Sequence, residues 1–98
     1  MANWNLITSF DKIKFVKVES SSDDELFKMA DLLLKGSPIV ANFDKVDVKT
    51  ANHMLSFLSG VVYALNGQAI QIRDKLFMLA SEEDFKDGTL NKYIEDIQ

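Results

Sequence analysis

The side chains that could carry out chemistry are few in this sequence and lie far apart. His53 is the only histidine, and the chain has no cysteine. A nucleophile–histidine arrangement with a histidine to spare, a histidine cluster for a metal and a thiolate zinc site are therefore excluded. The four glycines are scattered and form no phosphate-binding loop. We predict that this protein is not an enzyme and has no metal site and no cofactor.

Two acidic clusters are explained more simply as helix starts than as metal sites. Residues Ser22 to Glu25 have the spacing of a capping box, in which the serine and the glutamate satisfy free amides of the first turn. The acidic residues there also suit the positive end of the helix dipole. Glu82, Glu83 and Asp84 are expected to begin the last helix. His53 lies off the apolar seam of its predicted helix, so we expect a solvated side chain.

Length and composition indicate a single cytosolic domain. Of the 98 residues, 47% are apolar and 27% charged, which is ordinary for a soluble globular protein. A chain without cysteine suits a reducing cytoplasm. The net charge of −4 argues against nucleic acid as a partner, because phosphates attract a basic face. No apolar run approaches the roughly 20 residues of a spanning helix, and no secretion signal is recognisable.

The first half of the chain predicts a strand, a helix and a second strand. Ile13 to Val18 is rich in strand-forming residues, and its apolar positions change face midway, which indicates burial on both sides or a bulge. Helical spacing follows the capping box until residues 35–38 stop the helix. Ile39 to Phe43 is nearly continuous in apolar residues, as expected of a central buried strand.

The segment from Asp47 to Gly67 predicts one long helix. Its apolar seam steps by three and four residues without losing phase, so the helix continues past Gly60. The seam consists of Val48, Ala51, Leu55, Leu58, Val62 and Leu65. Asp47 is the expected N-cap, and Asn66 and Gly67 supply left-handed residues at the end. A glycine inside a helix costs about 0.5–1 kcal/mol relative to alanine, so we expect Gly60 to mark the close approach of another backbone.

A hairpin and a short helix complete the predicted fold. Residues 68–72 and 76–80 form the two strands, and residues 73–75 form the turn. Leu90, Tyr93, Ile94 and Ile97 then recur at helical spacing. The resulting order is β-α-β-α-β-β-α, a compact α/β sandwich in which helices pack on a small mixed sheet. The first twelve residues satisfy both strand and helix periodicity, so their secondary structure stays open.

Three segments resemble the SepF family of bacterial cell-division proteins. Residues 35–43, Lys-Gly-Ser-Pro-Ile-Val-Ala-Asn-Phe, are similar to the family's entry into its central strand. Residues 55–67, Leu-Ser-Phe-Leu-Ser-Gly-Val-Val-Tyr-Ala-Leu-Asn-Gly, are similar to its long helix and carry the most specific signal. Residues 71–79 are similar to its closing hairpin. The resemblance runs from about Ile13 to Ala80.

The resemblance implies a division scaffold that forms homodimers and higher polymers and binds the C-terminal peptide of the tubulin-like protein FtsZ. The family's assembly glycine matches Gly60, and we expect Phe57 and Val61 to flank it in the self-assembly surface. The family's pocket phenylalanine matches Phe77, with Leu79 on the same face of the strand. A lysine of that pocket matches Gln71, so this sequence departs from the family there.

The resemblance also implies a membrane tether at the division site, on the cytoplasmic side. Relatives have a basic amphipathic anchor followed by a long linker, whereas here residues 1–12 precede a SepF-like domain of residues 13–98. Either this segment is a reduced anchor that contacts the membrane through Trp4, Ile7 and Phe10, or the anchor is missing. A different class of protein also fits the pattern of elements: a small dimeric ligand-sensing regulatory domain, in which the sheet or dimer interface would hold a metabolite.

Overall fold

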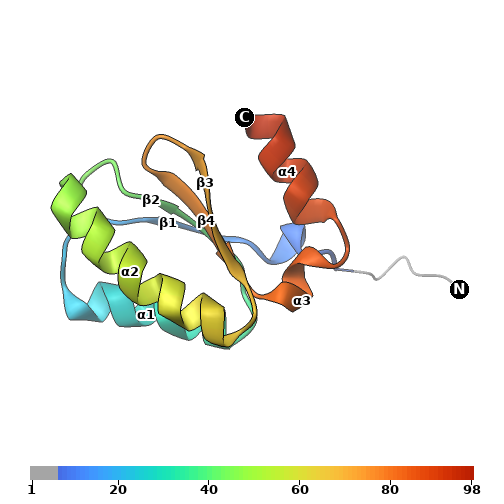
Figure 1. Ribbon diagram of the computed structural model, residues 1–98, viewed down its shortest axis with the longest axis horizontal. Coiled ribbons are helices and arrows are strands. Elements are labelled where there is room, and N and C mark those ends of the chain that lie inside the picture. The colour runs from blue at the N-terminus through green and yellow to red at the C-terminus, as the bar shows by residue number, and fades with distance from the viewer. Residues whose placement is uncertain (1–6) are drawn as a thin grey trace, which may run out of the picture.

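The computed structural model describes residues 7–98, and its ribbon is coloured along the chain in Figure 1. Within these residues, four strands form one mixed sheet in the order β1-β2-β4-β3. β1 runs parallel to β2, and β4 runs antiparallel to both β2 and β3. The strands are β1 (Lys14–Lys17), β2 (Ile39–Asn42), β3 (Gln68–Arg73) and β4 (Leu76–Ala80).

Helices lie on both faces of this sheet (Figure 1). The first layer consists of α1 (Asp23–Leu34) and α2 (Val48–Ala64), whose buried residues pack with Ile39, Ala41 and Leu79 of the sheet. On the other face, α4 (Thr89–Ile97) contributes Leu90 and Ile94 to a second core with Val40 and Met78. The α/β sandwich expected from the sequence is confirmed.

The apolar residues of β1 change face because each face of the sheet packs against its own core. Phe15 pairs with Val40, which faces α4, whereas Val16 pairs with Ala41, which faces α1 and α2. The pairing of β1 with β2 continues without a bulge. Central β2 is buried along Ile39–Ala41, as its apolar run predicted.

The start of α1 differs from a full capping box. The Glu25 amide donates to Ser22 Oγ at 3.2 Å, which is the expected cap. The Glu25 carboxylate, however, accepts from the amides of Glu19 and Ser20 at 3.0 Å each. These amides lie in the loop before the helix, so the carboxylate fixes the approach of the loop to α1 and does not return to the cap residue.

The helix α2 is continuous through Gly60, as the phase of its seam predicted. Asp47 caps it by accepting from the Thr50 amide at 2.8 Å. The seam is buried at Ala51, Leu58 and Val62, with Met54 as a further buried position, but Val48 at its start is 63% exposed. The first turn of α2 therefore projects beyond the sheet, and it leaves apolar surface uncovered.

The end of α2 depends on two residues with different tasks. Asn66 has the left-handed conformation, with φ of 56°. Gly67 follows, and a Cβ built on it would overlap the backbone of Ala80 at the end of β4. Glycine is therefore required at position 67 by the close approach of β4, whereas the turn itself is made by Asn66.

The hairpin joins β3 to β4 through a turn of Asp74 and Lys75, shorter than the three residues expected. Lys75 has a φ of 62°, and a register shift lies between Gln71 and Arg73. This irregularity lets Gln71 pair with Phe77 while Arg73 pairs with Leu76.

The prediction that the cluster of residues 82–84 begins the last helix is wrong. These residues form a separate short helix, α3 (Glu82–Phe85), capped by Ser81. Gly88 then adopts a φ of 83° and redirects the chain before α4 begins at Thr89. A left-handed glycine cannot continue a helix, so the two segments stay distinct.

The start of the described chain is fastened to this C-terminal part. Residues Phe10–Lys12 form a 3-10 helix. The amide of Ser9 donates to the Asp87 carboxylate at 2.8 Å, and the amide of Phe10 donates to Thr89 Oγ1 at 3.0 Å. Lys12 pairs with the buried carboxylate of Asp84 at 2.8 Å.

Candidate functional site

A groove lies between the first half of α2 and the β3–β4 hairpin. Its volume is about 150 Å³, which is enough for one apolar side chain but below the usual size of a pocket for a whole small molecule. The apolar part of its lining consists of Phe43, Val48, Ala51, Leu55 and Phe77, and the polar part of Asn52, Gln71, Asp74 and Lys75. The projecting first turn of α2 makes one wall of this groove.

The structure brings Phe77 and Gln71 together in this groove, where they are paired across the hairpin. Phe77 is half-buried and packs against the first core, with its ring 5.9 Å from the ring of Phe43. Leu79 lies on the same face of β4 but is fully buried. Its side chain has no surface for a partner to contact, so it supports the sheet beneath the helices and does not line the groove.

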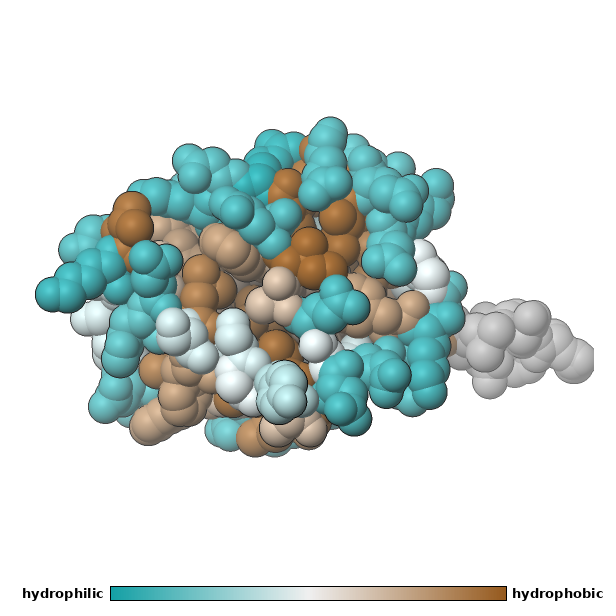
Figure 2. Space-filling model, viewed as in Figure 1, coloured by the Kyte–Doolittle hydropathy of each residue, from teal (hydrophilic) through white to brown (hydrophobic). Residues whose placement is uncertain are grey.

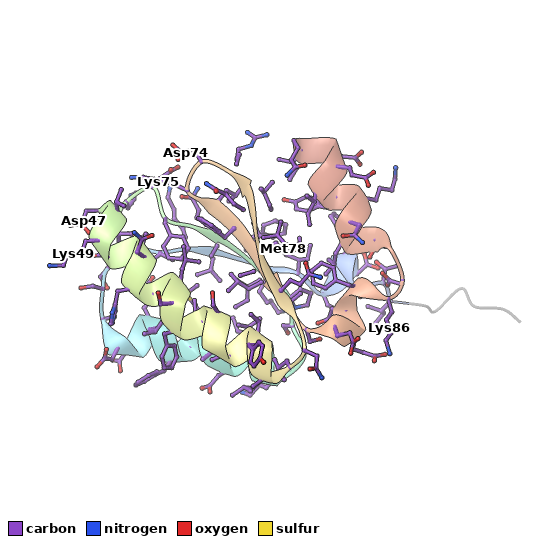
Figure 3. All side chains as sticks on the ribbon, in the orientation of Figure 1. Asp47, Lys49, Asp74, Lys75, Met78 and Lys86 are labelled. Carbon is purple, nitrogen blue, oxygen red and sulfur yellow. The ribbon has the colours of Figure 1, made fainter. Side chains whose placement is uncertain are left out.

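Lys75 places a positive charge at the mouth of the groove. Its ammonium group donates to the carbonyl of Val46 at 3.5 Å, which directs the side chain toward the start of α2. Figure 3 shows Asp74 and Lys75 at the tip of the hairpin, at the same end of the molecule as Asp47. Hydrogen bonds from Thr50 lower the pKa of Asp47, and the charge of Lys75 lowers it further.

Sequence reasoning assigned no role to Lys75, because it was predicted only as a turn residue. The position expected from the resemblance to match a lysine is Gln71, and Lys75 lies four residues further along the chain. The turn brings both side chains to one groove. No signal in the sequence marks Lys75 for this position, because its left-handed conformation, with φ of 62°, belongs to a two-residue turn that only the structure shows.

The expected assembly residues lie on α2, on the helix side of the molecule. Gly60 is exposed, and apart from its chain neighbours and the adjoining backbone of α2, no atom of the described chain lies within 4 Å of a Cβ built on it. Phe57 is 42% exposed, whereas Val61 is half-buried against the core. The close approach expected at Gly60 is thus not made by another part of residues 7–98.

Phe27 of α1 extends this surface and was missed by sequence reasoning. Its ring lies 5.8 Å from that of Phe57, and its side chain is 51% exposed. The two aromatic rings bridge α1 and α2 on the outside of the helix layer. The contact between Phe27 and Phe57 depends on how α1 and α2 align. The spacing of residues within either helix does not reveal that alignment.

The N-terminal residues expected to contact a membrane divide into two groups. Trp4 lies outside the described residues. Ile7 is 72% exposed, and Phe10 is 44% exposed with its ring 5.4 Å from that of Tyr93 in α4. In the described part of the chain, no helix has the length and apolar character needed to cross a bilayer.

The architecture and the groove together define a class of protein: a small α/β sandwich with a groove the size of one anchoring side chain. Comparison with known families gives a more specific result. Residues 13–83 match the model of the family described as cell division protein SepF. The chain belongs to the SepF family.

Curated relatives carry the same description, "Cell division protein SepF". The chain is 28% identical to the protein of Carboxydothermus hydrogenoformans over 92 residues, which cover 94% of this chain and 67% of the relative. It is 30% identical to that of Lactobacillus helveticus, covering 86% and 58% of the two chains. For Lactiplantibacillus plantarum the identity is 33%, covering 70% and 49%. The chain thus spans half to two thirds of the length of these relatives.

Proposed function

We propose that this chain is a cell-division scaffold that binds the C-terminal peptide of FtsZ in the groove between α2 and the hairpin. The observation that carries the proposal is the meeting of Phe77, Gln71 and Lys75 in one groove. Membership of the SepF family supports a role in division, and the groove supplies a place where a peptide would bind.

The groove suits a peptide with one apolar anchor. Peptide-binding sites derive most of their affinity from a few side chains in a well-packed pocket that is surrounded by polar groups. Here the half-buried ring of Phe77, supported from below by Phe43, forms the apolar floor, and Gln71 and Lys75 lie at its edge. In this proposal Lys75 supplies the cation that relatives carry at the position of Gln71.

The outer surface of α1 and α2 is proposed as the self-assembly surface. It combines the open position at Gly60 with the exposed pair of Phe27 and Phe57. Exposed aromatic rings on a helix layer lose water-contacting surface when a second copy covers them. The uncovered backbone at Gly60 would allow a second helix to approach closely.

We propose that the scaffold acts at the division site on the cytoplasmic face of the membrane. Contact with the membrane through Trp4, Ile7 and Phe10 would be weak, because an interfacial helix needs basic residues as well as apolar ones. Residues 1–10 contain no lysine or arginine. In this proposal localisation depends on FtsZ more than on lipid.

Calorimetric titration with a synthetic FtsZ C-terminal peptide tests the proposed function. The parent protein is expected to bind it, and Lys75→Gln is expected to bind it about two- to fivefold more weakly, the usual effect of one exposed charge. Gln71→Lys, which restores the family's cation, is expected to tighten binding by a similar factor. Asp74→Asn changes a charge on the same turn and indicates whether the effect belongs to the cation.

Two results would count against the proposed function. The first is the absence of saturable binding by the parent protein. The second is binding that is equally tight in the parent and in a double variant, Lys75→Gln with Gln71→Ala, because the peptide would then bind elsewhere.

A further inference from the structure

The outer edge of β1 differs from the rest of the sheet. β1 is the first strand in the order β1-β2-β4-β3, and none of residues 7–98 pairs with its outer side. The amides of Lys14 and Val18 donate inward, to the carbonyls of Pro38 and Asn42, both at 2.9 Å. Successive residues of a strand direct their backbone amides to opposite sides, so the amides of Phe15 and Lys17 point outward. An unpaired edge of this kind can accept another strand.

A groove lies on each side of this edge. Toward α1, a groove of about 400 Å³ is lined by Val16, Ser22, Asp24, Glu25, Lys28, Met29 and Leu32. On the opposite face of the sheet, a groove of about 260 Å³ is lined in part by Phe15, Lys17 and Leu76. Phe15 is 65% exposed although its ring lies 6.3 Å from that of Tyr93.

This arrangement matches what strand addition requires. In β-strand addition, backbone hydrogen bonds to the edge give affinity, and alternate side chains of the added strand enter pockets on the two faces. Here the outward amides of β1 offer the bonds, and the two grooves would receive the alternate side chains. The groove toward α1 has the half-buried side chains of Val16 and Leu32 as apolar contacts, and the other has Phe15.

Charge selects the kind of strand that fits. The chain as a whole is acidic, but this edge carries Lys14, Lys17 and Lys28, all exposed. None of the three makes a salt bridge with a described residue, since the ion pairs among residues 7–98 are made by Lys12 and Lys86. Asp24 and Glu25 also line the groove toward α1, so the three lysines stand against two carboxylates there. The Glu25 carboxylate accepts from the amides of Glu19 and Ser20.

A second copy of this chain is a poor occupant of the same edge. Pairing β1 with β1 of another copy would bring Lys14 and Lys17 of both copies to one short ladder, and like charges across strands destabilise it. Lysines on an edge strand are a known means of preventing such self-association. An acidic partner strand would instead place opposite charges beside these lysines.

We propose that the outer edge of β1 is a second peptide-binding site, which takes an extended, acidic segment of a partner protein with apolar residues among its acidic ones. The segment adds a strand beside β1 and places side chains in the grooves on both faces. This site is independent of the groove at Phe77, which lies between α2 and the hairpin.

The test uses the acetylated peptide Glu-Val-Leu-Glu-Val-Leu-Glu amide, which presents acidic and apolar groups on both faces of a strand. Titration followed by amide NMR should give saturable shifts in β1. Hydrogen exchange of the Phe15 and Lys17 amides should slow by about tenfold or more at saturation. The same peptide with lysine in place of each glutamate is the charge control and should not bind.

Lys17→Pro removes an outward amide while leaving the inward bonds of Lys14 and Val18 intact, and proline is tolerated on edge strands in this orientation. Lys17→Ala is the matched control, because it loses the same charge and keeps the amide. The proline variant should bind the acidic peptide about tenfold more weakly than the alanine variant. The reason is that the added strand would lose one backbone hydrogen bond and would fit the edge less well. Thermal melting shows that both remain folded, and Phe15→Pro repeats the test if Lys17→Pro does not fold.

Four results would overturn the proposal. They are equal binding by the proline and alanine variants, equal binding of the basic peptide, shifts confined to the hairpin, and saturable binding by neither peptide. A dimer of the parent protein that Lys17→Pro dissociates without any peptide would assign the edge to a second copy.

Discussion

The rings of Phe43 and Phe77 meet edge to face, with centroids 5.9 Å apart and planes at 80°. Phe43 is fully buried, while Phe77 is half-buried and lines the groove beside α2. The contact joins the floor of the groove to the first core. Phe77 therefore contributes to the fold and to the proposed site together, and its two contributions must be measured separately.

Phe77→Ala should lower both stability and peptide affinity. Removing a partly buried ring from the core is expected to reduce the free energy of unfolding by about 2–4 kcal/mol, somewhat less than for a fully buried phenylalanine. Loss of the groove floor should cost about 2 kcal/mol in binding of the FtsZ peptide, the threshold of a hot spot. Denaturant unfolding and calorimetry at a temperature where the variant is folded measure the two effects.

Met78→Ala is the matched control for this change. Met78 is the next residue of β4 but is buried on the opposite face, in the core under α4 (Figure 3). Its truncation should cost about 2–5 kcal/mol of stability and leave peptide affinity unchanged. A Phe77→Ala protein that binds the peptide as tightly as the parent would remove the groove from the proposed function.

Gly60→Lys should abolish higher assemblies without unfolding the chain. Nothing in the described chain obstructs a side chain at position 60, and lysine forms helices better than glycine. In a helix-to-helix contact the added charge would clash and would lose its water. Light scattering should report loss of polymers, and circular dichroism should be unchanged.

Asn91→Lys is the control for Gly60→Lys, because it adds the same charge to exposed surface of α4, on the other side of the sheet. It should assemble like the parent. Polymers of the Gly60→Lys protein equal in size to those of the parent would show that assembly uses a different surface.

Substitution by alanine should change the free energy of unfolding in opposite directions at Gly67 and Gly60. Gly67→Ala places a methyl group on the backbone of Ala80, which cannot move without disturbing β4, and should destabilise by about 1–3 kcal/mol. Gly60→Ala enters open space in a helix and should stabilise the monomer by about 0.5–1 kcal/mol. Denaturant unfolding of both variants under monomeric conditions is the measurement, and equal signs would contradict the assignment of Gly67 to close packing.

Binding to anionic liposomes should be weak or absent for this chain alone. The apolar residues near its start lack lysine or arginine to hold anionic lipid. Phe10 in addition packs on Tyr93, which keeps part of its ring away from a bilayer. Co-sedimentation with vesicles is the measurement, with Trp4→Ala as the variant. Strong sedimentation that this variant loses would show that the apolar contribution alone is sufficient.

The helices and strands follow from local patterns because the signals agree with one another. The seam of α2, its cap Asp47 and its end at Asn66 all indicate one helix, and Gly60 does not interrupt it. The order of strands is harder to predict, because β4 pairs with both β2 and β3, and no local pattern within these strands specifies that arrangement.

The proposed sites depend more strongly on this tertiary arrangement. Lys75 reaches the groove because a two-residue turn places the hairpin tip over the start of α2, and Phe27 meets Phe57 because two helices align. Figure 2 shows hydrophobic residues at the surface between the hairpin and α4, with hydrophilic residues around them. No single segment of the sequence contains these juxtapositions, so only the resemblance to relatives pointed to the hairpin.

Asp87 should make stability depend on pH at the acidic end of the range. The backbone amides of Thr89 and Ser9 donate to its carboxylate at 3.0 and 2.8 Å, and they lower its pKa from 3.8 to about 2. The ionised form is favoured by folding, so its contribution is present at pH values above the unfolded pKa. It is lost as the pH falls from about 4 to about 2, where both states become protonated.

Asp87→Asn measures this contribution, because asparagine keeps an acceptor but has no charge to lose. Its melting temperature should lie below that of the parent at about pH 6, and the difference should shrink steadily below about pH 4. Asp44→Asn is the control: Asp44 is exposed, and its carboxylate makes no hydrogen bond or salt bridge with a described residue. Its difference from the parent should stay nearly constant with pH. A difference for Asp87→Asn that is equally constant down to about pH 2 would show that the amides of Ser9 and Thr89 do not stabilise the carboxylate in solution.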